Sequence, residues 1–131
     1  MEISEGRLLA ADAVIFDDGE LLLMERTHDP YEGDWVLPGG LVEPDETARW
    51  ACAREVTEEI GLEVAVGSLI GLYDDPGRDP RGNVSVAYRC RPQQNAAPEP
   101  REEAARVEWF PTDELPELGF DHAEIVGDAL Q

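Results

Sequence analysis

The segment of residues 40–62 constrains this chain most, because it predicts a loop followed by one amphipathic helix. Residues 46–60 favour a helix, which Asp45 or Thr47 would cap at its start. Acidic residues stand in the expected first turn, where the helix dipole favours negative charge. Gly61 follows in the place of a left-handed C-terminal residue. The segment therefore predicts a helix with defined ends near the middle of the chain.

Three glutamates of this helix, Glu55, Glu58 and Glu59, share one face, because residues three and four apart lie roughly 5–6 Å from each other at Cβ. Cys52 and Val56 fall on an adjoining arc that can pack inward. Like charges at this spacing destabilise a helix, so a bound cation is one explanation for the cluster. Clustered carboxylates suit hard divalent ions, and magnesium also binds substrate phosphates. The alternative is a solvated acidic face on a chain that is acidic throughout.

Strand signals precede and follow the helix. Asp18-Gly19, between two apolar runs, suits the turn of a β-hairpin within residues 8–26. Residues 35–46 predict a short extended piece that a Pro-Gly-Gly sequence interrupts. The remaining signals are one or two strands in residues 62–73, strands at residues 84–91 and 106–110, and a short helix at residues 121–130. This order predicts a single α/β or α+β domain, residues 1–131, built as a sandwich and not as a doubly wound parallel sheet.

The charge balance argues against several classes of partner. Thirty acidic residues face ten basic ones, all of them arginine, for a formal net charge of −20. Such a chain is expected to repel nucleic acid and anionic membranes. Its acidic, lysine-free composition resembles that of halophilic proteins, in which high salt screens the charge repulsion. An acidic cytoplasmic protein of an ordinary organism is the plainer alternative.

Cysteine use and hydropathy favour a cytoplasmic protein. Cys52 and Cys90 are the only cysteines, so a disulfide scaffold is not expected, and their spacing does not suit a zinc site. No apolar run is long enough to span a bilayer. The first residues lack the basic start and cleavage site of a signal peptide.

Residues 40–62, GLVEPDETARWACAREVTEEIGL, resemble the signature of the Nudix hydrolases. Nine constrained positions in these 23 residues are filled at the family's spacing: Gly40, Glu46, Arg54, Glu55, Val56, Glu58, Glu59, Gly61 and Leu62. The stretches GDWVLPGG and VEWFPTDELP are similar to the same family, so the resemblance spans nearly the whole chain. It implies the Nudix α/β/α sandwich, with a curved mixed β-sheet between helices.

The resemblance also implies an activity, the hydrolysis of a nucleoside diphosphate linked to another moiety, with Mg²⁺ or Mn²⁺. It implies that Arg54 orients a glutamate and that Glu46 supports the join between loop and helix. The implied metal ligands are Glu55, Glu58, Glu59 and the backbone carbonyl of Gly39. Metal ions would neutralise the anionic diphosphate, stabilise the leaving phosphate and lower the pKa of bound water.

A water-activating base in this family often comes from a loop outside the signature. Here residues 98–110, PEPREEAARVEWF, contain the candidates, and the family's spacing before the Trp-Phe pair favours Glu103, then Glu102. Glu99 is the third acid of this loop. The alternative is a solvated acidic loop, since a base must reach the attacking water.

The segments around the signature indicate the substrate. Pro76 stands where the ADP-ribose pyrophosphatase branch tends to have proline, and residues 75–82, DPGRDPRG, resemble the Nudix domains associated with NAD metabolism. This resemblance implies hydrolysis of ADP-ribose to AMP and ribose 5-phosphate, and suggests a homodimer. Two alternatives stay open: a nucleoside triphosphate pyrophosphohydrolase of the nucleotide-cleansing type, and a sensor that binds ADP-ribose without turnover.

The same loop supplies candidate substrate-binding residues. Arg78 and Arg81 would meet phosphate or ribose oxygens, with Asp79 fixing them; the alternative is a rigid turn whose arginines pair with nearby acids. Trp35 would either stack on an adenine or belong to the core. Two residues near the C-terminus are expected to be structural: Phe120 and His122.

Overall fold

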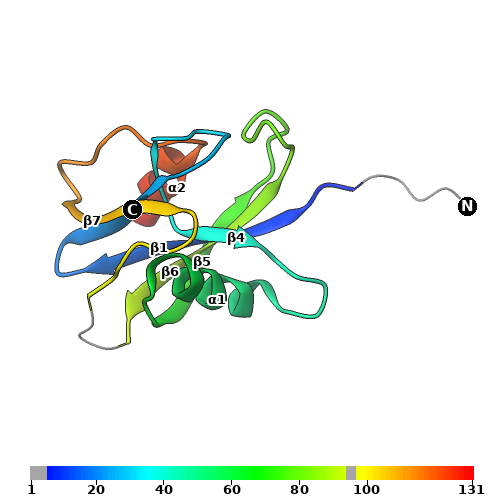
Figure 1. The fold of residues 1–131 in the computed structure, drawn as a ribbon. Coiled ribbons are helices and arrows are strands. Elements are labelled where there is room, and N and C mark those ends of the chain that lie inside the picture. Colours follow the sequence, from blue (N-terminus) through cyan, green and yellow to red (C-terminus); the bar gives the residue numbers. More distant parts are fainter. Residues whose placement is uncertain (1–5, 94–96) are drawn as a thin grey trace, which may run out of the picture.

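The computed structural model describes residues 6–93 and 97–131, which form a sheet between two helices (Figure 1). The strands are β1 (Leu9–Asp17), β2 (Glu20–Arg26), β3 (Trp35–Val36), β4 (Gly39–Leu41), β5 (Val64–Tyr73), β6 (Val84–Pro92) and β7 (Ala104–Pro111). The helices are α1 (Ala48–Ile60) and α2 (His122–Ala129). This arrangement confirms the predicted α/β/α sandwich.

Strand β1 lies at the centre of a mixed, seven-stranded sheet. It pairs in parallel with β6 and antiparallel with β2 and β4. The strand order is β3-β2-β1-β6-β5, and β7 pairs with β2 off this path. The short strand β4 thus places the loop before α1 directly beside the middle of the sheet.

The predicted hairpin joins β1 and β2. Asp18 and Gly19 form its turn with φ angles of 51° and 78°, the left-handed pair that this turn requires. Residues 62–73, predicted as one or two strands, contribute the single strand β5, whose pairing with β6 is interrupted by irregularities. The other predicted strands and the C-terminal helix are also present.

Helix α1 begins two residues later than the sequence predicts. Thr47 caps it, and its side chain accepts a hydrogen bond of 3.0 Å from the backbone N–H of Trp50. The prediction of an acidic first turn is wrong, since Glu46 lies before the cap and accepts a hydrogen bond from Arg54 instead. Gly61 ends the helix in the expected left-handed conformation, with a φ of 66°.

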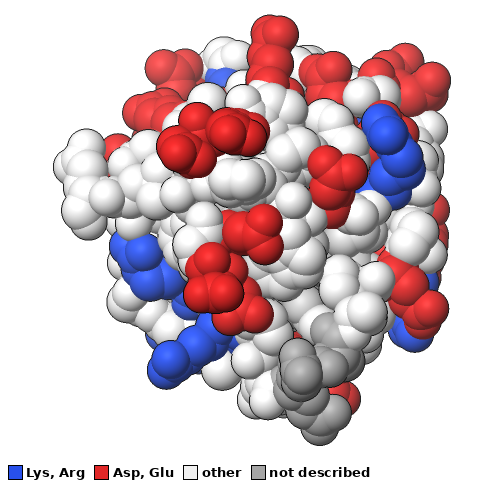
Figure 2. All heavy atoms as spheres, turned by 90° about the vertical axis from the view of Figure 1, so that its left-hand side faces the viewer, with Lys and Arg blue, Asp and Glu red and all other residues white. Residues whose placement is uncertain are grey.

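The surface is strongly acidic, as the composition requires. Figure 2 shows Asp and Glu side chains spread across one face, with the arginines gathered in a few small groups toward its sides. Within the described residues, no helix is both long enough and apolar enough to cross a membrane.

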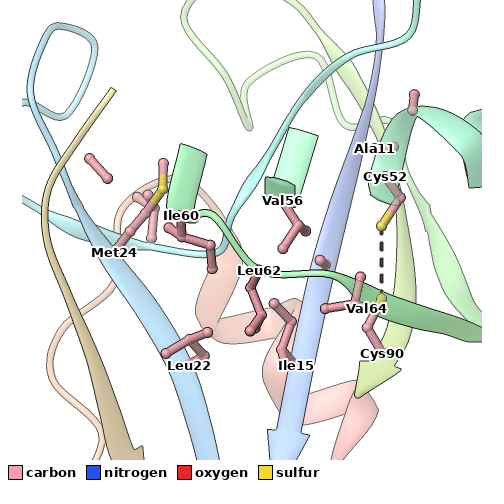
Figure 3. Close-up of a cluster of buried hydrophobic side chains, with 14 residues drawn as sticks. Ala11, Ile15, Leu22, Met24, Cys52, Val56, Ile60, Leu62, Val64 and Cys90 are labelled. Atoms are coloured by element: carbon pink, nitrogen blue, oxygen red, sulfur yellow. Dashed lines mark hydrogen bonds between the residues drawn. The ribbon is translucent and has the colours of Figure 1, made fainter. Parts of the chain in front are cut away.

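Two hydrophobic clusters fill the two faces of the sheet. The cluster under α1 includes Ile15 of β1, Leu22 of β2 and Val56 of the helix (Figure 3). The cluster under α2 joins Val14 of β1 to Ile125 of that helix. Alternate residues of β1 therefore serve opposite layers, which is why a central strand of this sheet is apolar on both sides.

The two cysteines lie in the cluster under α1. Cys52 projects from the helix toward Cys90 of β6, and their sulfur atoms are 3.9 Å apart (Figure 3). Both thiols are free and buried.

Candidate active site

Two glycines let the loop before α1 pack against acidic side chains. A Cβ at Gly39 would collide with the carboxylate of Asp12 and with the backbone of Ala11, both on β1. A Cβ at Gly40 would collide with the carboxylate of Glu55 on α1. The close approach therefore explains the Gly-Gly pair and brings the loop, β1 and α1 together at one point.

Arg54 organises the acidic face of α1. Its Nη1 donates to Oε1 of Glu55 at 2.9 Å and to Oε2 of Glu58 at 3.0 Å. Its Nε donates to Oε2 of Glu46 at 2.9 Å, and Glu46 in turn accepts a hydrogen bond from the backbone N–H of Glu43. One guanidinium thus holds two of the predicted metal ligands next to each other and ties the helix to the preceding loop.

Glu59 points into the interior and is only 1% exposed. Its Oε1 accepts a hydrogen bond of 2.8 Å from the backbone N–H of Gly39. Its Oε2 is buried and has no hydrogen-bond partner among the described residues. Burial raises the pKa of Glu59 well above its ordinary value, although the hydrogen bond from Gly39 opposes the shift. A buried carboxylate oxygen without a partner is costly, so this atom requires a ligand or a proton.

The acidic residues present fit a hard divalent cation. Burial raises the pKa of Glu55 as well, in spite of the hydrogen bond from Arg54. Within residues 6–93 and 97–131, no three His, Cys, Asp or Glu side chains stand as a formed metal centre, since Arg54 holds two carboxylates and Gly39 holds the third. The unpartnered oxygen of Glu59 and the all-oxygen donor set are nevertheless what Mg²⁺ or Mn²⁺ prefers.

A cavity of about 280 Å³ lies beside this acidic cluster. Six of the predicted site residues line it: Gly39, Glu55, Arg78, Asp79, Arg81 and Glu103. Gly39 and Gly40 form part of its wall, whereas Glu58 and Glu59 stand outside the lining. The structure therefore brings the glutamate helix, the DPGRDPRG loop and the candidate base to one cavity.

The two arginines of the DPGRDPRG loop are held by acids in different ways. Arg78 is buried, and it donates to both carboxylate oxygens of Asp121 at 2.8 and 2.7 Å. Arg81 is half-exposed, and its guanidinium donates to both carboxylate oxygens of Asp79 at 3.1 and 3.0 Å. Arg78 therefore fixes the loop to the start of α2, whereas Arg81 keeps a solvent-facing cation at the cavity.

Trp35 does not line the cavity. Its ring packs edge-on against Phe110, with centroids 5.0 Å apart, and the guanidinium of Arg106 lies over it at 4.9 Å. Glu103 lines the cavity with its side chain 49% exposed, and its Oε1 lies 3.8 Å from Nε2 of His28. Of the residues predicted from the flanks, Glu103 is at the cavity, whereas Trp35 is partly buried and packs against the cluster under α2, as the alternative of a core position predicts.

The lining also includes residues that did not emerge as site candidates from the sequence, among them Asp12, Arg26, Phe120 and His122. Arg26 ends β2 and is buried, and burial lowers the pKa of its guanidinium. Arg26 and Arg81 both face the ring of Phe120, at 5.3 and 5.7 Å from its centroid. The sequence did carry one signal, since Asp12 is an acid flanked on both sides by apolar residues of β1.

A buried polar network supports the wall of the cavity. Asp12 accepts a hydrogen bond from the hydroxyl of Ser85, and its Oδ2 lies 3.7 Å from Nε2 of His122. Nδ1 of His122 accepts a hydrogen bond of 3.0 Å from the backbone N–H of Leu37. Burial lowers the pKa of His122, with Asp12 opposing the shift, so the neutral ring fixes the loop before the glycines.

A mixed sheet between two helices, with an acidic helix beside a cavity, is the arrangement expected of a Nudix hydrolase. The family model for the NUDIX domain matches residues 6–128. The chain belongs to the Nudix hydrolase family.

Known proteins extend this comparison. The chain is 38% identical to an ADP-ribose pyrophosphatase of Methanocaldococcus jannaschii over 94% of its own length and 73% of the relative's. It is 38% identical to a MutT-like protein of Streptomyces ambofaciens, of which it spans 65%. The NUDIX domain of Shewanella oneidensis NrtR, solved in complex with ADP ribose, matches with a TM-score of 0.82 and 27% identity, covering 97% of this chain and 88% of that one.

Proposed function

We propose that this chain hydrolyses ADP-ribose to AMP and ribose 5-phosphate, with Mg²⁺ or Mn²⁺ as the cofactor. The relative from Methanocaldococcus jannaschii is an ADP-ribose pyrophosphatase, and the NrtR domain binds ADP ribose. The cavity of this chain has Glu55 of α1 on one side and arginines of the DPGRDPRG loop on the other, which suits an anionic substrate held through a cation.

The observation that carries the proposal is the unpartnered Oε2 of Glu59 beside Gly39. A stabilising role alone would not leave a carboxylate oxygen buried and unsatisfied on the helix that faces the cavity. Glu59, Glu55, Glu58 and the carbonyl of Gly39 would hold the cation. Bound there, the cation would neutralise the diphosphate and lower the pKa of the attacking water.

Three further residues would position the glutamates, the substrate and the attacking water. Arg54 keeps Glu55 and Glu58 adjacent through its two hydrogen bonds. Arg81 offers an exposed cation to a phosphate or ribose oxygen. Glu103 would accept the proton of the attacking water as that oxygen adds to phosphorus and the bridging oxygen leaves with the other phosphate.

A substrate panel with and without magnesium, with AMP release as the readout, tests the proposal. We expect turnover of ADP-ribose that depends on the cation and is abolished in Glu58→Gln. Glu63→Gln is the matched control, because Glu63 carries the same charge just beyond α1, is exposed and lies outside the cavity lining. Both variants should keep the wild-type circular dichroism spectrum.

Other products would point to the alternatives. Release of inorganic pyrophosphate from nucleoside triphosphates, at rates above those for ADP-ribose, would identify a nucleotide-cleansing enzyme instead. Tight binding of ADP-ribose without any product would identify a sensor. Full activity of Glu58→Gln would overturn the assignment of the metal ligands.

The domain extent, the cellular location and the oligomeric state are proposed from the composition and from the resemblance to the family. We propose one catalytic domain over residues 1–131 in the cytoplasm of a halophile, in line with two free cysteines and a net charge of −20. We also propose a homodimer, which light scattering tests directly: twice the chain mass of 14.5 kDa is expected, and a mass of one chain would refute it.

A further inference from the structure

Two arginines stand apart from the rest of the chain's cations. The guanidinium groups of Arg89 and Arg91 make no hydrogen bond or ion pair with any described residue, although the chain contains 30 acids. The other arginines each donate a hydrogen bond to a carboxylate, a histidine or a backbone carbonyl. In a protein of net charge −20, most guanidinium groups should find a carboxylate partner. Two guanidinium groups without one, on the residues that flank Cys90, therefore require an explanation.

Both arginines line a groove of about 450 Å³ on the sheet. Cys90 between them belongs to the core under α1, so Arg89 and Arg91 project from the opposite face, because side chains alternate along a strand. The rest of the lining is apolar or small: Phe16, Ala65, Val66, Gly67 and the strand at Cys90. Helix α2 shares this face but contributes no residue to the groove, since its eight residues span only about 12 Å.

The groove is separate from the candidate active site. The two cavities have no lining residue in common. Asp12 lines the candidate active site, and Phe16 lines the groove. The two residues are four positions apart on β1, which corresponds to about 13 Å along the strand. A ligand in the groove would therefore leave the glutamate helix and the diphosphate site accessible.

We propose that this groove binds a small organic anion with a flat apolar body. Phe16, Ala65 and Val66 would receive the apolar body, and Arg89 and Arg91 would receive a phosphate, sulfonate or carboxylate group. Arg89 already lies over the ring of Phe16, at 5.8 Å from its centroid, so cation and aromatic surface adjoin. The groove volume is in the range of small-molecule sites. An acidic protein or nucleic acid would meet the repulsion of the whole acidic surface, whereas a small anion carries too little charge for that to dominate.

Titration with naphthalene-2-sulfonate, followed by ¹H–¹⁵N NMR on the full chain, tests the proposal. We expect amide shifts centred on Phe16, Ala65 and Arg91, and binding about tenfold weaker in Arg91→Gln because one charge-assisted contact is lost. Arg106→Gln is the matched control, since Arg106 is an exposed arginine outside the groove, and it should keep wild-type affinity. The neutral naphthalene-2-sulfonamide should bind much more weakly than the sulfonate.

Ala65→Leu supplies a second test that leaves the charge unchanged. Its larger side chain would fill the groove, so naphthalene-2-sulfonate should lose affinity in a variant that keeps a native spectrum. Equal binding of the sulfonate and the sulfonamide would overturn the proposal. So would unchanged binding in both Arg91→Gln and Ala65→Leu, or shifts centred on the cavity of Asp12 and Glu55.

Discussion

At the scale of single residues, contacts around the Gly-Gly pair set the position of the acidic side chains. Gly40 lies so close to α1 that the carboxylate of Glu55 occupies the place of a Cβ. The backbone N–H of Gly39 donates a hydrogen bond to Glu59, and its α-carbon packs so close to Asp12 that a Cβ would collide with that residue. These glycines therefore control where Glu55 and Glu59, two of the proposed cation ligands, stand, although neither glycine has a side chain.

Gly40→Ala should lower catalytic activity by more than about tenfold, because the new methyl group displaces the carboxylate of Glu55 from its place beside the loop. Steady-state AMP release from ADP-ribose measures the effect. Gly127→Ala is the control: Gly127 lies within α2 with open space around it, so alanine should preserve activity and add a few tenths of a kcal/mol of stability. Wild-type activity in Gly40→Ala would contradict this role.

The buried His122 predicts a loss of stability toward acid. Burial holds its pKa below the ordinary value of 6.5, so the unfolded chain takes up a proton at a pH where the folded chain does not. The free energy of unfolding should therefore fall as the pH drops below about 6.5, by about 1.4 kcal/mol for each unit by which the pKa is lowered. Urea unfolding between neutral and mildly acidic pH measures this slope.

His122→Asn should flatten that slope, because asparagine keeps an acceptor for the N–H of Leu37 and does not titrate. The overall stability of this variant will be lower, so the comparison is of slopes and not of absolute values. His28→Asn removes the half-exposed second histidine and should keep the wild-type slope. A slope that disappears with His28 and persists without His122 would contradict the assignment.

At the scale of elements, locally determined structure was predictable from the sequence. The β1–β2 turn follows from Asp18-Gly19, and the end of α1 follows from Gly61, because each needs a left-handed backbone. The signature spacing also predicted Glu55, Glu58, Glu59 and Arg54 on one helix. The structure places Glu55 and Glu58 together on Arg54, whereas Glu59 points into the interior and bonds Gly39. The turn, the helix end and the pairs of Arg54 with Glu55 and Glu58 depend on neighbours within a few residues, so their signals survive in the sequence alone.

Contacts between distant segments were not predictable in the same way. The loop before β7 docks on the end of α1, where the N–H groups of Glu99 and Arg101 donate to the carbonyls of Ile60 and Glu59 at 2.9 and 2.8 Å. This satisfies helix carbonyls that have no partner of their own and places Glu103 at the cavity. Backbone hydrogen bonds of this kind leave no residue pattern, and the position of Arg26 at the cavity was missed because it too depends on contacts between distant segments.

The N-terminal cap of α1 supports a prediction about stability. Thr47→Ala removes the acceptor for the N–H of Trp50 and should lower the free energy of unfolding by about 1 kcal/mol. Thr47→Ser keeps the hydroxyl and should unfold at nearly the wild-type urea concentration. If the two variants unfold alike, the cap does not contribute to stability in the way that the structure indicates.

At the scale of the whole molecule, the main feature is the excess of negative charge. With 30 acids against 10 bases, the surface of Figure 2 repels itself, and salt screens the repulsion over about 10 Å at 0.1 M and about 3 Å at 1 M. The midpoint of thermal unfolding should therefore be higher in molar KCl than in dilute buffer. Sodium chloride at equal ionic strength is the control, because screening does not depend on the cation. Equal stability in dilute buffer and in molar salt would refute the halophilic assignment.

The facing thiols of α1 and β6 have a practical consequence for following the motions of this protein. Cys52 and Cys90 are buried, and their mutual hydrogen bond together with burial raises the pKa of Cys52, so the native chain presents little reactive thiolate. A thiol-directed dye can modify them only when the helix separates from the sheet. Labelling kinetics thus report the separation of α1 from the sheet directly, with no engineered probe.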